Sequence, residues 1–231
     1  MGPDMRILAA ADVHGFLDVY RWLVRQAREQ AVEAVVLGGD LLGIPDENED
    51  VEAGMRACAE EIQSIFGPLG RPVLYIMGND DLIDLPPHAG FEAIHRRRLE
   101  IGGTAFVGYA GGPPFLGGPF DREPPELERE LAALEPLVDA RTVLVTHYPA
   151  AGTLDETFHG ETAGLQPIRS LVERRPFLIH VHGHIHGRFG RVENHLNVAS
   201  AGRKRAMVIE LPSRTHWIVE ERDSSEYPRS E

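Results

Sequence analysis

The sequence predicts a layered α/β fold in a single domain, with a second sheet formed by the C-terminal part of the chain. Short apolar runs alternate with segments of helical periodicity up to Val181. After Gly187 the pattern changes to one strand after another. Alternating strands and helices predict a sheet flanked by helices, and the strand-rich end indicates a second sheet. No internal repeat or long linker divides the 231 residues.

Each predicted element follows from its own periodicity. Apolar runs predict strands at residues 6–11, 34–37, 72–77, 104–109, 142–146 and 177–181. Apolar residues at helical spacing predict helices within residues 16–27, 51–65, 127–138 and 165–171. Further strands are predicted at residues 190–192, 195–199, 206–211 and 216–219. We therefore expect a domain over residues 1–220 and a disordered polar tail over residues 221–231.

The composition favours a cytoplasmic protein. No apolar run approaches the roughly 18–20 residues that span a bilayer, which argues against a membrane protein. The predicted first strand leads directly into Asp12 and His14, so cleavage of a signal peptide would remove them. The single cysteine, Cys58, excludes an internal disulfide. The 36 acidic and 23 basic residues give a formal charge of −13, which opposes long-range capture of nucleic acid.

Side chains of the metal-ligating types recur just after predicted strands, in the segments AAADVHG, LGGDLLG, MGNDD, VTHYP and VHGHIHG. They are Asp12, His14, Asp40, Asn79, His147, His184 and His186. In open α/β sheets, sites form just beyond the carboxyl ends of the strands. We therefore expect these side chains to face one pocket.

The residue types and their spacing predict a divalent-metal site. Carboxylate, imidazole and amide oxygen, without thiolate, suit hard-to-borderline divalent metals. Asp12 and His14 are two residues apart, so on extended backbone they would point the same way, and His184 and His186 repeat this spacing. An aspartate supplies two oxygens and can bridge two ions. A pair of ions stabilises both the attacking and the leaving oxygen in a displacement at phosphorus.

The motifs DVH, GGD, GND, TH and GHIH, in this order between Asp12 and His186, resemble those of the calcineurin-like metallophosphoesterase superfamily. The resemblance implies a four-layer α/β/β/α sandwich, in which two mixed sheets are flanked by helices, and a metallophosphoesterase domain over residues 1–220. It also implies a P–O bond hydrolysed by a metal-bound hydroxide. The family uses two divalent ions of manganese, iron, zinc or nickel, and the sequence does not choose among them.

Carried over residue by residue, the resemblance implies a ligand set for each metal. The first metal would be held by Asp12, His14, Asp40 and His186. The second metal would be held by Asp40, Asn79, His147 and His184. Asp40 would therefore bridge the two ions.

Four further features each have two interpretations. His180 and His182 share the parity of the ligands but lie outside GHxH, so they are core residues or groups that orient ligands. His159 is a solvated loop residue or one that reaches the substrate. The basic run 96–98 is a solvated face or a phosphate contact. The Gly/Pro-rich loop 111–125 is a surface connection, or it serves as a lid, a specificity loop or a dimer contact.

Asp80 departs from the family pattern, in which many members have histidine after the asparagine. A carboxylate beside divalent cations has a lowered pKa and is a poor general acid, so protonation of the leaving group would depend on water, metal or His159. Its negative charge repels a monoester dianion more than a diester monoanion. At about 4 Å and an effective dielectric near 20, the repulsion is about 4 kcal/mol per pair of unit charges. We therefore predict a phosphodiesterase in which Asp80 and His159 are candidate catalytic residues.

Three alternatives remain open. A phosphomonoesterase of the protein-phosphatase kind would use the same metals. A non-catalytic scaffold would be a protein-binding relative, although such a protein has little reason to keep a full ligand set. A nuclease is the third alternative, and the sequence has no evident groove of aromatic and basic residues to favour it. The preferred partner is thus a small phosphodiester, while the oligomeric state stays open.

Overall fold

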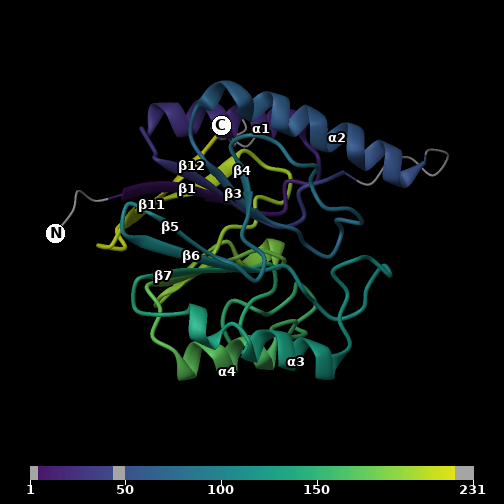
Figure 1. Cartoon of the computed structure of the whole chain (residues 1–231), viewed down its shortest axis with the longest axis vertical. Coiled ribbons are helices and arrows are strands. Elements are labelled where there is room, and N and C mark those ends of the chain that lie inside the picture. The colour runs from purple at the N-terminus through teal and green to yellow at the C-terminus, as the bar shows by residue number, and fades with distance from the viewer. Residues whose placement is uncertain (1–4, 44–49, 222–231) are drawn as a thin grey trace, which may run out of the picture.

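The computed structural model describes residues 5–43 and 50–221 and contains two mixed six-stranded sheets (Figure 1). The strands of the first sheet are β1 (Met5–Ala10), β2 (Ala34–Gly38), β3 (Val73–Ile76), β4 (Phe91–Ala93), β11 (Arg205–Leu211) and β12 (His216–Glu220). Their order is β12-β11-β1-β2-β3-β4. The pairs from β1 to β4 are parallel, whereas β11 is antiparallel to both of its neighbours.

The second sheet has the same mixed character. Its strands are β5 (Arg98–Ile101), β6 (Thr104–Tyr109), β7 (Thr142–Thr146), β8 (Ile179–His182), β9 (Gly190–Val192) and β10 (His195–Asn197). Their order is β5-β6-β7-β8-β10-β9. The inner pairs are parallel and the edge strands β5 and β9 pair antiparallel. Most strands that precede the predicted ligands are thus inner parallel strands, whose carboxyl ends meet at one edge of each sheet.

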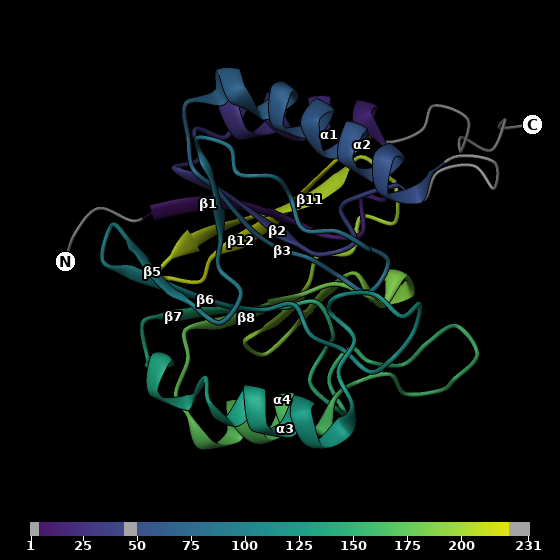
Figure 2. The ribbon, with the colours of Figure 1, turned by 45° about the vertical axis from the view of Figure 1, so that its right-hand side comes forward.

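Helices cover the outer face of each sheet, so the layers run helix, sheet, sheet, helix (Figure 2). The first outer layer contains α1 (Leu17–Glu29) and α2 (Val51–Phe66), and the second contains α3 (Pro124–Ala132) and α4 (Gln166–Arg174). Short 3₁₀ turns are η1 (Gly67–Leu69), η2 (Glu135–Leu137) and η3 (His186–Arg188). The predicted four-layer α/β/β/α sandwich is therefore confirmed. No helix in the described residues is long and apolar enough to cross a membrane.

Strand alternation separates two hydrophobic cores. On β6, Phe106 packs into the large core that includes the space between the sheets, whereas Val107 packs into a second core against α3 and α4. On β7, Val143 and Val145 belong to the first core and Leu144 to the second. Because successive strand residues point to opposite faces, one apolar run serves both cores. This explains why these runs read as continuous apolar segments in the sequence.

Strands β4 and β5 are absent from the sequence prediction. They are edge strands of three and four residues, and their side chains are half-buried or exposed, so they lack an apolar run. In the basic run 96–98, Arg96 and Arg97 are exposed, as in a solvated face, whereas Arg98 is the first residue of β5. There the Arg98 guanidinium lies 2.9 Å from Asp139 and 2.8 Å from Glu100. Apart from Glu221, the predicted tail lies outside the described residues.

A buried hydrogen-bond chain supports the end of β7, directly before His147. Thr146 Oγ1 donates to Tyr148 O at 2.5 Å and lies 2.7 Å from His180 Nε2. The hydroxyl has one proton, so His180 Nε2–H must be the donor to Oγ1. His180 Nδ1 is then the acceptor for His195 Nδ1–H at 2.9 Å. His180 is fully buried, so it is a core residue. Its hydrogen bond to Thr146 links it to the predicted ligand His147, which is the next residue in the chain.

This chain predicts a pH dependence of stability. Burial, followed by the neighbouring His182 and His195, lowers the pKa of His180 well below its usual value. The imidazole of His180 is therefore protonated at a higher pH in the unfolded chain than in the folded protein. As a result, the free energy of unfolding falls as the pH drops below about 6.5. We expect a loss of up to about 1.4 kcal/mol per pH unit from this histidine.

Urea unfolding between pH 7.5 and pH 5 measures the effect. His180→Gln should show a shallower decline of the free energy of unfolding than the wild type. His88→Gln, which changes an exposed histidine, should keep the wild-type slope. Equal slopes for His180→Gln and the wild type would contradict the prediction.

Candidate metal centre

Main-chain hydrogen bonds place the segments after β1 and β2 side by side. Asp12 N donates to Gly39 O at 2.9 Å, and His14 N donates to Asp40 O at 2.9 Å. The carboxylates of Asp12 and Asp40 therefore emerge at neighbouring positions. Both residues are buried, with 0% and 3% of their surface exposed. Two adjacent buried carboxylates are costly unless cations or hydrogen-bond donors compensate them.

Several predicted ligands have left-handed backbone. The φ angles are 55° at Asp12, 50° at His14, 51° at Asp40 and 66° at His184. Such conformations cost roughly 1–3 kcal/mol each in residues other than glycine and cluster at functional sites. They turn the chain sharply after β1, β2 and β8.

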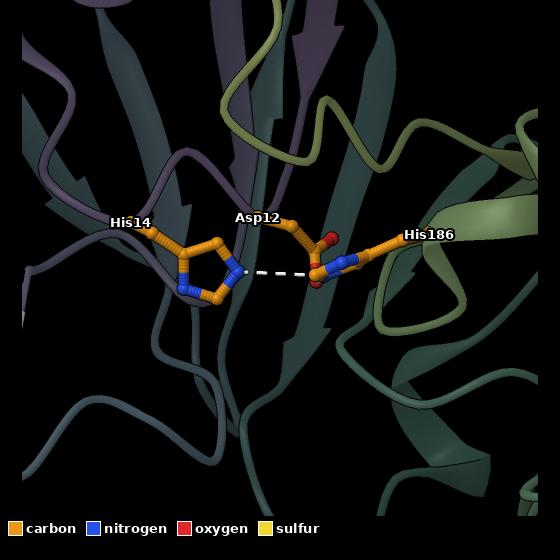
Figure 3. Close-up of side chains that lie close together, drawn as sticks. All are labelled: Asp12, His14 and His186. Atoms are coloured by element: carbon orange, nitrogen blue, oxygen red, sulfur yellow. Dashed lines mark hydrogen bonds and ion pairs between the residues drawn. The ribbon is translucent and has the colours of Figure 1, made fainter.

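The first ligand group consists of Asp12, His14 and His186 (Figure 3). His14 Nε2 lies 3.3 Å from His186 Nε2, and His186 Nε2 lies 3.1 Å from Asp12 Oδ1. Figure 3 shows the two imidazole rings approaching one another beside the Asp12 carboxylate. The hydrogen bond to Asp12 is the main cause that raises the pKa of His186. The three donor atoms thus converge at one point, as ligands of one ion do.

The second ligand group surrounds His147. Its Nε2 atom lies 2.9 Å from Asn79 Oδ1 and 3.3 Å from Asp40 Oδ2, while Nδ1 donates to Gly38 O at 3.0 Å. Burial opposes a charge on His147, but Asp40 raises its pKa to about 10. The proton on Nε2 therefore sits between two oxygen ligands. Because Nδ1 is bonded to a carbonyl, Nε2 is the nitrogen on which a metal would replace this proton.

A third group contains His14, Asp40 and Asp80, and Asp12, Asp40 and His147 form a further overlapping one. Within each group the donor atoms lie within 4.8 Å of one another. His184 belongs to none of these groups of described residues. Its main-chain N–H donates to both Asp12 oxygens at 3.1 and 3.0 Å, and its ring lies 5.2 Å from the His147 ring. The structure thus brings His184 to the cluster, with its imidazole beside the second group.

Glycines allow the ligand segments to approach one another. A Cβ atom on Gly78 would lie 2.1 Å from Asp40 Oδ1, and one on Gly183 would lie 2.2 Å from Asp12 Oδ2. A Cβ on Gly39 would lie 2.5 Å from His147 Nδ1. Real Cβ atoms essentially never come this close. The glycines of the motifs GGD, GND and GHIH are therefore required by contact with the carboxylates and imidazole of the site.

Asp81, which is not among the predicted site residues, ties two ligand segments together. It is buried, and its carboxylate accepts hydrogen bonds from Gly78 N at 2.8 Å, Leu42 N at 2.8 Å and Leu41 N at 3.0 Å. Burial and then the charge of Asp40 raise the pKa of Asp81 to about 7, against these three donors. The sequence gives little indication of this role of Asp81, because two of the three donors lie about 40 residues away in the chain.

His159 lies apart from the ligand groups. It is exposed, and its ring packs edge-on against Phe158 at 5.7 Å. Among the described residues, no hydrogen bond, ion pair or ring contact links it to the cluster. The Tyr148 ring, which the sequence does not single out, instead lies 4.1 Å from the His184 ring. A catalytic role for His159 stays a prediction.

The donor set fits divalent metal ions. Two buried carboxylates, an amide oxygen and imidazole nitrogens converge from five strand ends, and a proton on His147 occupies one place between them. Oxygen and imidazole donors without thiolate suit manganese, iron, zinc or nickel.

The family model of calcineurin-like phosphoesterases matches residues 5–188. No curated protein matches the sequence at a significant level. The structure is similar to that of TT1561 from Thermus thermophilus, with a TM-score of 0.69 at 15% identity over 94% of this chain and 99% of that one.

Two further solved structures share the fold. A dimetal phosphatase from Danio rerio has a TM-score of 0.59 at 12% identity, over 94% of this chain and 98% of that one. An archaeal phosphodiesterase has a TM-score of 0.50 at 13% identity, over 93% of this chain and 99% of that one. The chain belongs to the calcineurin-like phosphoesterases, a family of metal-dependent phosphohydrolases.

The glycine contacts predict a sharp steric effect. Gly183→Ala places a methyl group against the Asp12 carboxylate, so we expect the affinity for Zn²⁺ to fall by about tenfold or more. Competition with a chromophoric chelator measures this affinity. Gly187→Ala is the matched control, because nothing lies within 4 Å of its Cβ position. Equal loss of affinity in both variants would argue against the contact.

The bonds to Asp81 predict a stability effect. Asp81→Ala leaves three buried main-chain N–H groups without their acceptor, and we expect a loss of about 3 kcal/mol in the free energy of unfolding. Glu128→Ala is the control, because Glu128 is exposed on α3 and forms no hydrogen bond or ion pair with the described residues. Urea unfolding of the metal-free proteins compares the two, and a loss below about 1 kcal/mol for Asp81→Ala would contradict the prediction.

Proposed function

We propose that this protein is a phosphodiesterase that hydrolyses a small phosphodiester with two divalent metal ions. The ligands are those expected from the motifs: Asp12, His14, Asp40, Asn79, His147, His184 and His186. When bound, the metals supply Lewis acidity at phosphorus and make water acidic enough to attack. The buried carboxylates and the proton held on His147 support this assignment, because the site requires positive charge.

The protein supplies orientation and a fixed electrostatic field. Asp40 accepts a hydrogen bond from Asp80 N at 2.9 Å through Oδ1 and faces His147 through Oδ2, so its two oxygens point to different partners. This orientation suits a bridging carboxylate. Main-chain donors to Asp12 from His184 and the carbonyl acceptor for His147 at Gly38 hold the remaining ligands in place. A phosphoryl group entering the site therefore meets ligands that do not need to rearrange.

The Asp80 carboxylate is the observation that carries the preference for diesters. It lies beside the metal ligands, with Oδ2 at 3.5 Å from His14 Nδ1, and forms one group with His14 and Asp40. Asp80 adds a third negative charge to those of Asp12 and Asp40 at the site. Its repulsion of the substrate rises with the charge of the substrate, so a monoester dianion is disfavoured more than a diester monoanion. Asp80 thus selects against the more highly charged ester.

Among the described residues, no side chain is positioned to donate a proton to the leaving group. Burial raises the pKa of Asp80, and Asp40 raises it further, but His14 and His147 act in the opposite direction. Bound cations would add to that lowering. His159 can take part only if substrate reaches its exposed loop. We therefore expect esters with good leaving groups to be hydrolysed fastest.

Hydrolysis of bis-p-nitrophenyl phosphate and p-nitrophenyl phosphate at saturating Mn²⁺ tests the proposal. We expect a higher kcat/KM for the diester, and a loss of at least about 100-fold in Asp40→Ala and His147→Ala because each removes a metal ligand. Asp80→His should raise the ratio of monoester to diester activity by about tenfold, since it removes one negative charge.

Asp84→Ala, which removes an exposed carboxylate from the same loop, should leave both activities unchanged. Metal-loaded, folded protein without activity on either ester would contradict a hydrolytic function. A higher monoester rate that Asp80→His does not alter would contradict the role of Asp80 while leaving the phosphohydrolase assignment intact.

A further inference from the structure

We propose that Asp80 is a positioning residue of the metal centre, whose carboxylate orients one ligand of each metal, Asn79 and His14. The inference rests on the proposed two-metal site, but it concerns metal binding rather than hydrolysis. It assigns to Asp80 a function that a histidine at this position would not perform. The evidence lies in the separate partners of its two oxygens.

The first oxygen holds Asn79. Asn79 Nδ2 donates to Asp80 Oδ1 at 2.7 Å, and on the other side Asn79 Oδ1 lies 2.9 Å from His147 Nε2. An amide group has similar shape at both ends, so its neighbours decide which end faces the metal. A carboxylate accepts hydrogen bonds only and therefore binds the NH₂ end. Asp80 thus presents the oxygen of Asn79, which is the end that ligates, to the second metal.

The second oxygen faces His14. Asp80 Oδ2 lies 3.5 Å from His14 Nδ1, while His14 Nε2 lies 3.3 Å from His186 Nε2 in the first ligand group. The imidazole therefore has one nitrogen toward a carboxylate and the other toward the metal position. A ligating histidine commonly donates its second N–H to a carboxylate, which sets the tautomer and raises the basicity of the ligating nitrogen. Asp80 supplies this carboxylate to the first metal.

Aspartate is suited to both tasks at once. Its two oxygens accept independently, whereas a neutral imidazole has one acceptor and one donor and could serve one of these partners only. The contact between residue 80 and Asp40 is made by the main-chain N–H, which side-chain substitutions retain. The Asp80 side chain is 20% exposed, and the neighbouring Asp81 anchors the loop independently. Variants at position 80 therefore change the two ligand contacts without removing the loop anchor.

Two substitutions separate the two contacts. Asp80→Ala removes both acceptors, so we expect the affinity for both Zn²⁺ ions to fall by about 10–100-fold. Asp80→Asn retains a single amide oxygen, which can accept from Asn79 or from His14 but not from both, so one of the two affinities should fall. Asp84→Asn makes the same chemical change at an exposed position and should leave both affinities unchanged. Stepwise competition with chelators of known affinity measures the two dissociation constants.

A spectroscopic measurement tests the His14 contact directly. In Zn²⁺-loaded wild-type protein with ¹⁵N-labelled histidine, we expect His14 to carry its proton on Nδ1 and to use Nε2 as ligand, and Asp80→Ala should shift that N–H resonance. Asp80→Ser replaces Asp80→Ala if the latter does not fold, and His14→Gln assigns the resonance.

Three results would overturn the proposal. The first is a change below about twofold in both Zn²⁺ affinities for Asp80→Ala. The second is weakening of a single ion by Asp80→Ala, since the residue would then serve one ligand only. The third is the absence of an Nδ1 proton on His14 in the wild type, which would make Asp80 and His14 Nδ1 joint ligands of an ion. Absence of diesterase activity with these binding results intact would contradict the proposed function alone.

Discussion

The site depends on how closely the main-chain segments approach one another where the inner strands of both sheets end. Gly78 brings its backbone against the Asp40 carboxylate, and Gly183 brings the segment after β8 against Asp12. A methyl group at either position would occupy space already taken by a ligand oxygen. The first sheet supplies the carboxylates and the asparagine, and the second sheet supplies histidines such as His147. The face-to-face packing of the two sheets is therefore a condition for the metal centre and not only for the hydrophobic core.

Charge imposes a second constraint on the same atoms. Asp12 and Asp40 are held almost entirely away from water, and a buried pair of like charges is stable only with compensation. Part of it comes from main-chain donors, such as His184 N to Asp12 and Asp80 N to Asp40. The rest comes from the proton that Asp40 holds on His147. A metal ion bound by His147 would replace this proton.

The sequence is sufficient to predict the inner strands and a set of candidate ligands, but not the contacts between segments that lie far apart in the chain. Strands such as β7 are long apolar runs because both of their faces are buried, whereas β4 and β5 are short edges with no such pattern. The ligands follow from ordered motifs, and the structure brings them together. The contacts of Asp81 with Leu42 and of Asp80 with His14 join segments that lie far apart in the chain, so no local pattern reveals them.

The left-handed backbone at Asp12, His14, Asp40 and His184 has a consequence for how this protein acquires metal. These turns are unfavourable alone and are maintained by hydrogen bonds within the protein, such as that from Asp12 N to Gly39 O. In small zinc domains, by contrast, metal binding and folding are one reaction. Here main-chain hydrogen bonds and close backbone approaches within the fold set the positions of the predicted ligands. Residues that touch no ion, such as Gly39, therefore contribute to the affinity for metal, because they hold the backbone of a ligand in its left-handed conformation.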